Sequence, residues 1–458
     1  MRLVPWCLGV ESPPLKPIFT LMHLPHRPFV SFVLATYNRV TILIDCLQRT
    51  LNAALPALGP GRFNIIVVDN ASTDNTAQLV QDFAAEQRHI KLIRLPKNCG
   101  PVAKNVALHE NAADILVLLD DDAYPMPGAI SQMVRHFQDD PQLGAAVFDV
   151  TLPDGRKEAS AYPDVFIGAG TALRGTALRT LTATGRPGRA GGGLLPADFF
   201  MQAEEYDLSF RLLAAGFSVQ RFWDMPLMHL KAPGARVGTR TTRLDIRNNL
   251  WLLARYIPDP LCSQLAADWL SRYWNMSISR DEPGARAHKA AFLRGAAEGL
   301  LHWPAQRASG TTLLPQDTLE RIFKFNAIRN RLAHAQEKFG LRRIAFGDWG
   351  KNLLPYYQAA TALNLEIIAV VDGFLATPEH FGTKNSVEYR GIPVINEMIF
   401  TEYQQNADAI IITALSPVHA DRRAAALRRT LKIPVIDLFS RPSPTLDSPK
   451  VLSQLTLS

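Results

Sequence analysis

Long apolar runs are missing from the 458-residue chain, and no stretch is apolar over the roughly 18 residues that a membrane-spanning helix requires. The N-terminus is rich in Pro and His and does not have the charged head, apolar run and small-residue cleavage site of a secretory signal. We therefore expect neither a membrane span nor a signal peptide. Residues 1–28 are expected to form an unstructured leader.

Cysteine is also scarce. The chain has four cysteines, which are scattered and include no CxxC pair. This pattern argues against both a disulfide framework and a zinc knuckle. It favours a reducing, cytoplasmic compartment.

A run of Lys and Arg with interleaved aromatic residues, as found in segments that follow a nucleic-acid backbone, is absent. The net charge of +7 and the pI near 9.2 nevertheless suit anionic partners such as nucleotide diphosphates or anionic lipid headgroups. Nucleic acid is the least favoured partner, and we expect none. With 47% hydrophobic and 20% charged residues, most of the chain should be globular.

Strand-length apolar runs alternate with helical stretches from residue 29 onward, which predicts an α/β fold with a mainly parallel sheet. The expected strands lie at 29–36, 63–70, 90–96, 114–120, 144–150 and 217–223. A Gly-rich stretch at 185–193 predicts a mobile loop. We assign residues 29–260 to this first domain.

Helical periodicity follows over 244–335, with aromatic and basic residues and a break at 279–287. Two interpretations of the connector, assigned to 261–340, stay open. Its helices pack between domains, or an amphipathic basic segment lies on a membrane surface. The strand and helix alternation then restarts, which predicts a smaller Rossmann-like domain over 341–440, followed by a disordered tail at 441–458.

Three acids, Asp120, Asp121 and Asp122, end the strand at 114–120. Because side chains alternate along a strand, Asp120 and Asp122 point to one side at its carboxyl end, where ligands of open α/β sheets bind. Two carboxylates there can hold a hard divalent cation, which can neutralise a diphosphate leaving group. The alternative is an acidic, solvated turn.

Polar residues also follow the second and third strands. Asp69 in VDNASTD lies where a carboxylate accepts hydrogen bonds from a base or ribose, whereas Asp74 in the same turn can cap the next helix. In LPKNCGPVAKN the Gly-Pro pair signals a turn and a helix start. Asn98, Lys104 and Asn105 are then expected to face the same crevice.

These segments, in this order, resemble the family 2 inverting glycosyltransferases of the GT-A fold over about residues 29–260. The resemblance rests on ATYNR (35–39), VDNASTD (68–74), NCGPVAKN (98–105), the DDD acids and AEEYDLSFRLLAAGF (203–217). It implies a nucleotide-diphospho-sugar transferase domain that binds a nucleotide-sugar donor and uses a divalent cation, Mn²⁺ or Mg²⁺.

The resemblance also implies roles for individual residues. The expected donor-binding residues are Thr36, Asn38, Arg39, Asp69, Asn98, Lys104, Asp120, Asp121 and Arg247, and the expected metal ligands are Asp120, Asp122 and His229. GAGTALR (168–174) should lie under the donor sugar and acceptor. Arg243, four residues before Arg247, would share its helical face. Lys104 stands where relatives often have Arg, and its ammonium cannot make a bidentate contact.

The EEYDL motif stands where the family commonly has EDxDL. Its second acid is the expected catalytic base, which is Glu205 here, with Glu204 as the fallback. A glutamate can accept the proton of the acceptor hydroxyl, although its extra methylene shifts the reach of the carboxylate. Asp207 is expected to be a structural acid near Arg211. The alternative for the cluster is an acidic, solvated helix start.

In the second domain FGDWGKNLL keeps Gly347 and Gly350 but lacks a full GxGxxG, and Asp372 ends the next strand where a ribose-binding acid would lie. The domain resembles the small Rossmann-like domains of polysaccharide-biosynthesis proteins. A structural or regulatory role is favoured over nucleotide binding.

The sequence therefore predicts an inverting, metal-dependent transfer of a sugar from a nucleotide-diphosphate donor, UDP by default, to a hydroxyl of a glycan or lipid-linked acceptor. Cell-surface polysaccharide biosynthesis, in the cytoplasm or at the inner face of the membrane, is the expected setting. The alternative is a non-catalytic protein that binds a nucleotide sugar or a partner and has a regulatory C-terminal domain. A nucleotidyltransferase is disfavoured because ATYNR does not provide the Gly-rich basic loop that such enzymes need.

Overall fold

The computed structural model describes residues 24–109, 112–183, 193–231, 238–278, 285–308, 313–375 and 387–440. Most of the predicted leader and of the Gly-rich loop, residues 279–284 of the predicted break at 279–287, and the predicted tail lie outside these residues.

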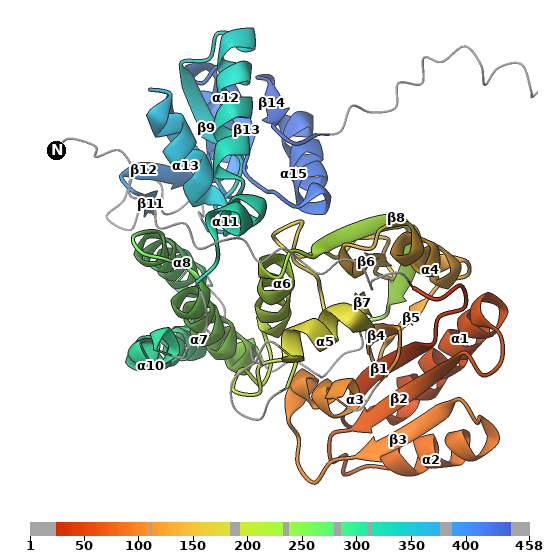
Figure 1. Cartoon of the computed structure of the whole chain (residues 1–458). Coiled ribbons are helices and arrows are strands. Elements are labelled where there is room, and N and C mark those ends of the chain that lie inside the picture. Colours follow the sequence, from red (N-terminus) through yellow and green to blue (C-terminus); the bar gives the residue numbers. More distant parts are fainter. Residues whose placement is uncertain are drawn as a thin grey trace, which may run out of the picture.

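The first domain is built on an eight-stranded mixed sheet with the order β3-β2-β1-β4-β7-β6-β8-β5 (Figure 1). Its strands are β1 (Val30–Thr36), β2 (Phe63–Asp69), β3 (Ile90–Arg94), β4 (Ile115–Asp120), β5 (Ala123–Pro125), β6 (Leu143–Thr151), β7 (Gly170–Arg174) and β8 (Ser218–His229). The strands from β3 to β4 run parallel, β7 is antiparallel to both of its neighbours, and β8 is parallel to β6. All six expected strands are confirmed, whereas the short strands β5 and β7 were missed.

Helices cover both faces of this sheet, so its central strands are apolar throughout. They are α1 (Val40–Leu58), α2 (Thr76–Glu86), α3 (Asn105–His109), α4 (Ala129–Asp139), α5 (Gly175–Ala183) and α6 (Glu204–Ala214), with the short 3₁₀ helix η2 at Gly100–Lys104. Along β1, Phe32 and Leu34 belong to one core and Val33 to the other. Leu43 of α1 and Phe137 of α4 complete the first of these cores.

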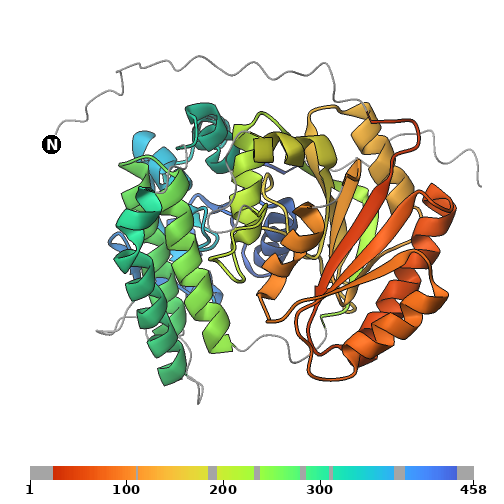
Figure 2. The ribbon, with the colours of Figure 1, turned by 60° about the horizontal axis from the view of Figure 1, so that its bottom comes forward.

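Six helices connect the two sheets: α7 (Gly238–Tyr256), α8 (Leu261–Ile278), α9 (Ala285–Leu301), α10 (Trp303–Arg307), α11 (Gln316–Phe323) and α12 (Phe325–Phe339). Helices α7 and α9 lie side by side (Figure 2) because two glycines of α9 allow a close approach. A Cβ at Gly295 would lie 2.5 Å from the carbonyl oxygen of Arg243, and a Cβ at Gly299 would lie 2.4 Å from Leu250. Trp269 of α8 is buried. The packed interpretation of the connector is therefore confirmed for α7, α8 and this face of α9.

The C-terminal domain contains a six-stranded sheet with the order β11-β12-β10-β9-β13-β14. Its elements are β9 (Arg343–Phe346), α13 (Leu353–Ala362), β10 (Glu366–Val371), β11 (Glu388–Tyr389), β12 (Ile392–Ile395), α14 (Glu397–Tyr403), β13 (Ala409–Ile412), α15 (Pro417–Thr430) and β14 (Val435–Asp437). All neighbouring strands are parallel except the edge pair β11 and β12. Because β10 and β13 flank β9 on opposite sides, the strand order reverses there, which is where ligands bind in such sheets.

In the described part of the chain, no helix has both the length and the apolar character needed to cross a membrane.

Candidate active site at the carboxyl edge of the first sheet

Three neighbouring parallel strands end in the polar residues that the sequence singled out. Thr36 ends β1 and pairs with Asp69 at the end of β2, while Ala35 pairs with Asp120 at the end of β4. The parallel register brings these residues to one edge of the sheet. The mixed half of the sheet adds His229, because β5 and β8 pair Ala123 with this residue.

Asp120, Asp122 and His229 form a cluster whose ligand atoms all lie within 4.8 Å of one another. The Nε2 atom of His229 lies 3.1 Å from Asp122 Oδ1 and 3.9 Å from Asp120 Oδ2. Asp122 and His229 are buried, and Asp120 is partly exposed. Two carboxylates and one imidazole suit Mn²⁺, which accepts both oxygen and nitrogen ligands. The three predicted ligands therefore come together and fit a divalent cation.

Glu158, in the loop after β6, orients this histidine. Its carboxylate lies 2.7 Å from His229 Nδ1 and 2.6 Å from Lys231 Nζ. Burial alone would raise the pKa of Glu158, but the hydrogen bonds from His229 and Lys231 lower this pKa to about 2. A carboxylate on one ring nitrogen fixes the orientation of a histidine whose other nitrogen faces a metal. Sequence reasoning missed Glu158, because no motif surrounds it.

Asp121 points the other way and joins the acidic strand end to the ATYNR loop. It accepts a hydrogen bond from Thr36 Oγ1 at 2.9 Å and lies 3.7 Å from Arg39 Nε. Burial raises the pKa of Asp121 to about 6, against the opposing effects of Arg39 and Thr36. The alternation expected along DDD is thus observed, with the middle acid on the side of the predicted nucleoside pocket.

Two interlocked turns carry the residues that are predicted to bind the nucleoside. Asp69 is fully buried and accepts hydrogen bonds from the Ser72 amide at 3.1 Å and from Arg94 Nε at 3.3 Å. Asn38, in the left-handed region with φ of 55°, accepts a hydrogen bond from the Thr73 amide at 2.9 Å. These bonds preshape the ATYNR and VDNASTD segments. Arg94 was not predicted.

The NCGPVAKN segment supplies a buried cation. Lys104 is 3% exposed, and its Nζ lies 3.2 Å from Asp120 Oδ1 and 3.4 Å from the Gly168 carbonyl oxygen. Asn98 accepts a hydrogen bond from the Gly100 amide at 2.8 Å, which holds the turn before η2. Asn105 bonds to the backbone of Leu195, so it supports the neighbouring loop.

Helix α6 begins with the two candidate bases. Glu205 is partly exposed and lies against Gly168, where an added Cβ would be 3.0 Å from Glu205 Oε1. Glu204 is 4% exposed, and its Oε2 has no hydrogen-bond partner among the described residues. Burial raises the pKa of both carboxyl groups. Lys104 and Gly168 link this pair to Asp120.

Residues 31–185 match the family model "Glycosyl transferase family 2". This stretch is a family 2 glycosyltransferase domain.

Two curated relatives match a quarter of the chain. A poly-beta-1,6-N-acetyl-D-glucosamine synthase of Staphylococcus epidermidis is 30% identical over 117 residues, which are 25% of this chain and 27% of that protein. An undecaprenyl-phosphate 4-deoxy-4-formamido-L-arabinose transferase of Shewanella sediminis is 32% identical over 116 residues, 25% of this chain and 34% of that protein. The matches thus span about a third or less of these relatives.

Among solved structures, S. aureus TarS is 14% identical and covers 73% of this chain and 55% of its own, with a TM-score of 0.43. A mannosyltransferase from Pyrobaculum calidifontis, in complex with GDP-Man and Mn²⁺, is 18% identical and covers 79% of this chain and 90% of its own, with a TM-score of 0.39.

Asp207 of α6 lies after the matched residues 31–185. It is a structural acid, as expected. Its fully buried carboxylate lies 2.8 Å from Arg211, 3.3 Å from Arg255 and 2.8 Å from the Tyr256 hydroxyl. Arg211 was predicted, but the partners on α7 were not. This network fixes α6, and with it Glu205, against the connector.

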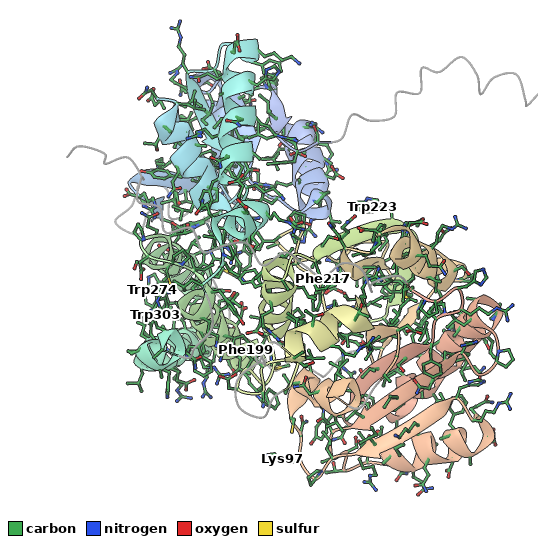
Figure 3. The ribbon with its side chains drawn as sticks, viewed as in Figure 1. Lys97, Phe199, Phe217, Trp223, Trp274 and Trp303 are labelled. Atoms are coloured by element: carbon green, nitrogen blue, oxygen red, sulfur yellow. The ribbon has the colours of Figure 1, made fainter. Side chains whose placement is uncertain are left out.

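Arg247, which belongs to α7, packs against the loop that precedes α6. It donates to the carbonyl oxygens of Asp198 and Phe199, both at 3.0 Å, and its guanidinium lies 4.3 Å from the Trp251 ring centroid. Phe199, labelled in Figure 3, is buried between the glycosyltransferase domain and the connector. Arg243 pairs instead with Glu298 of α9. A contact between Arg247 and a donor stays a prediction.

Proposed function

We propose that the chain transfers a sugar from a nucleotide-diphosphate donor to an acceptor hydroxyl, with inversion, and that a divalent cation held by Asp120, Asp122 and His229 is required. The observation that carries this proposal is the acidic cluster at the strand ends, joined through Lys104 to the two glutamates of α6.

The site and the relatives support a proposal for the donor and the acceptor. We take UDP as the default nucleotide, with Thr36, Asn38, Arg39, Asp69 and Asp121 at the nucleoside end. The two relatives are named for a polysaccharide and for an undecaprenyl-phosphate sugar. A glycan or lipid-linked acceptor in cell-surface polysaccharide assembly is therefore the proposed setting.

In the proposed reaction the Glu205 carboxylate accepts the proton of the acceptor hydroxyl. The acceptor oxygen bonds to the anomeric carbon from the face opposite the diphosphate, and the bond to the leaving oxygen breaks with its electron pair. We assign to Lys104, which lies beside Asp120 and the Gly168 carbonyl, the role of holding donor oxygens during this step. A bound cation would supply positive charge that neutralises the departing diphosphate.

Glu205 is preferred over Glu204 because its side chain is the more exposed of the two. Glu204 is almost fully enclosed, whereas Glu205 is partly exposed next to the segment expected under the acceptor. A base must lie within hydrogen-bond reach of the acceptor, and exposure of its carboxylate makes such reach attainable.

The alternative, a non-catalytic binding protein, would not require this acid. Transfer to glycan and undecaprenyl-phosphate acceptors, measured by mass spectrometry with a panel of UDP-, dTDP- and GDP-sugars and Mn²⁺, separates the two proposals. We expect a product with the wild type and a loss of about 10²- to 10⁴-fold with Glu205→Gln. The matched control is Glu86→Gln at the end of α2. A folded Glu205→Gln variant with wild-type rates would refute the assignment of the base.

We further propose that α9 contacts an anionic membrane surface. Its outer face exposes 58% of Leu293, 51% of Leu300 and 76% of Leu301, beside the exposed Arg286 and Arg294. An apolar stripe flanked by cations suits an anionic lipid surface.

Co-sedimentation with phosphatidylglycerol vesicles tests this contact. We expect the double change Leu293→Ser and Leu301→Ser to abolish it, and Phe339→Ser on α12, which is also half exposed, to preserve it. A wild-type chain that stays in the supernatant would refute membrane contact.

A further inference from the structure

A cavity of about 640 Å³ opens where the glycosyltransferase domain, the connector and the C-terminal sheet meet. Its walls come from the loop after β9, the start of α15, α8 of the connector and Tyr206 of α6. The cavity therefore lies at the carboxyl end of β9 and β13, beside the point where the strand order reverses. Ligand pockets of small metabolites are of this size.

Cations dominate the walls. Arg272, Lys351, Arg422 and Arg423 line the cavity together with one acid, Asp348. Burial raises the pKa of Asp348, the one acid among these lining residues. Such a wall favours an anionic ligand.

Two of these arginines keep unused donors. Arg272 donates its Nε to the Trp349 carbonyl oxygen at 2.6 Å, and its terminal nitrogens make no hydrogen bond among the described residues. Arg422 is exposed and forms no hydrogen bond or ion pair within the described part of the chain. By contrast, Arg423 is bound to Glu397 and to the carbonyl oxygens of Gly347 and Val371.

Two further features point to the same ligand. Helix α15 has 14 residues and begins with Pro417, and its N-cap residue Ser416 makes no side-chain capping bond to the amides of the first turn. Asn352, another wall residue, is 3% exposed, and its carboxamide oxygen accepts no hydrogen bond from the described residues.

A dinucleotide does not suit this edge of the sheet. Asp372, the expected ribose-binding acid, accepts hydrogen bonds from the amides of Trp349, Phe374 and Leu375. The guanidinium of Arg423 donates to the carbonyl oxygens of Gly347 and Val371, so it occupies the space at the carboxyl ends of β9 and β10. The remaining space lies on the α15 side and accommodates a smaller molecule.

The geometry points to a second ligand site in this cavity, which binds a phosphate-bearing small molecule, a sugar phosphate or a nucleoside phosphate, through Arg272, Arg422 and the start of α15. The site needs no metal, because its charges are those of arginine side chains. Tyr206 of α6 lines this cavity and directly follows the candidate base Glu205 on that helix.

Calorimetry on the full chain in excess chelator tests the proposal, with inorganic pyrophosphate, UDP and glucose 1-phosphate as probes. We expect saturable binding of at least one probe that falls about tenfold or more in Arg422→Ala. Arg429→Ala, an exposed arginine at the far end of α15, should bind like the wild type. Tighter binding of UDP than of pyrophosphate would identify a nucleoside phosphate, and tighter binding of glucose 1-phosphate a sugar phosphate.

Absence of metal-independent binding of all three probes, or binding that Arg422→Ala leaves unchanged, would overturn the proposal. Asp122→Ala separates this result from the proposed transfer activity, since that change should leave pyrophosphate binding in chelator intact.

Discussion

The cluster at the end of β4 depends on a residue that is not one of its ligands. Glu158 holds the Nδ1 side of His229, so that Nε2 faces Asp120 and Asp122. The imidazole would otherwise be free to rotate away from the cation position.

We therefore predict that Glu158→Ala weakens Mn²⁺ binding by about 10- to 100-fold, because the orientation of His229 is lost. Electron paramagnetic resonance of free Mn²⁺ measures this affinity. Asp154→Ala removes an exposed carboxylate four residues earlier and should leave it unchanged. Equal affinity of Glu158→Ala and the wild type would show that His229 needs no such support.

Burial of Glu205 predicts a pH dependence. Burial raises the pKa of this carboxyl group above the ordinary glutamate value of 4.5. A general base acts only when deprotonated, so kcat/KM should fall as the pH is lowered through the raised pKa. The acid limb of the wild-type pH profile should thus lie above 4.5, and the residual activity of Glu205→Gln should not show this limb. An acid limb at the ordinary glutamate value would contradict a base with a raised pKa.

At the scale of elements, helix α6 links the site to the rest of the molecule. Its acidic start faces Gly168 and Lys104, and one turn later Asp207 is buried against Arg211 and Arg255. The position of Glu205 is therefore set by an ion network on its own helix and on α7.

Removing the acid of this network should destabilise the domain. Asp207→Ala leaves the buried guanidinium of Arg211 without its carboxylate and Arg255 with Asp198 alone, and we expect a loss of about 3–5 kcal/mol in the free energy of unfolding. Urea denaturation followed by tryptophan fluorescence measures this loss, with the exposed Asp82→Ala on α2 as control. A loss within that of the control would mean that α6 is held by apolar packing alone.

The strands that carry the site residues could be predicted from the sequence. The strands that carry Asp69 and Asp120 are continuous apolar runs, and His229 was expected from the motif order. Glu158 and Arg94 were missed because loop and strand pairing bring them to the site from positions without a motif. Arg255, 48 residues from Asp207, was missed because helix docking is not encoded in local spacing.

For the whole molecule, Lys351 is one of several residues that join the C-terminal domain to the rest. Lys351, in the loop after β9, donates to Asn249 of α7 at 2.9 Å, and its ammonium lies 5.1 Å from the ring centroids of Tyr206 and Trp269. Cation–π contacts in such an enclosed position are worth about 2 kcal/mol.

We predict that Lys351→Met weakens the contact between the C-terminal domain and the rest of the chain, because the hydrogen bond and the aromatic contacts of the ammonium are removed. Differential scanning calorimetry should then resolve a separate, earlier transition of the C-terminal domain. Lys338→Met, which removes an ammonium over the exposed ring of Phe339, serves as the matched control. Identical thermograms for Lys351→Met and the control would show that the domains are coupled by other contacts.

The central claim is that a nucleotide diphosphate binds together with a cation at the end of β4. Calorimetry in the Arg422→Ala background, which removes the second site, tests it by titrating UDP, dTDP and GDP with Mn²⁺, with Mg²⁺ and with chelator. We predict tight binding of one diphosphate that disappears in chelator or when Asp122→Ala is added. Absence of binding under every metal condition, or binding that neither chelator nor Asp122→Ala alters, would contradict the account.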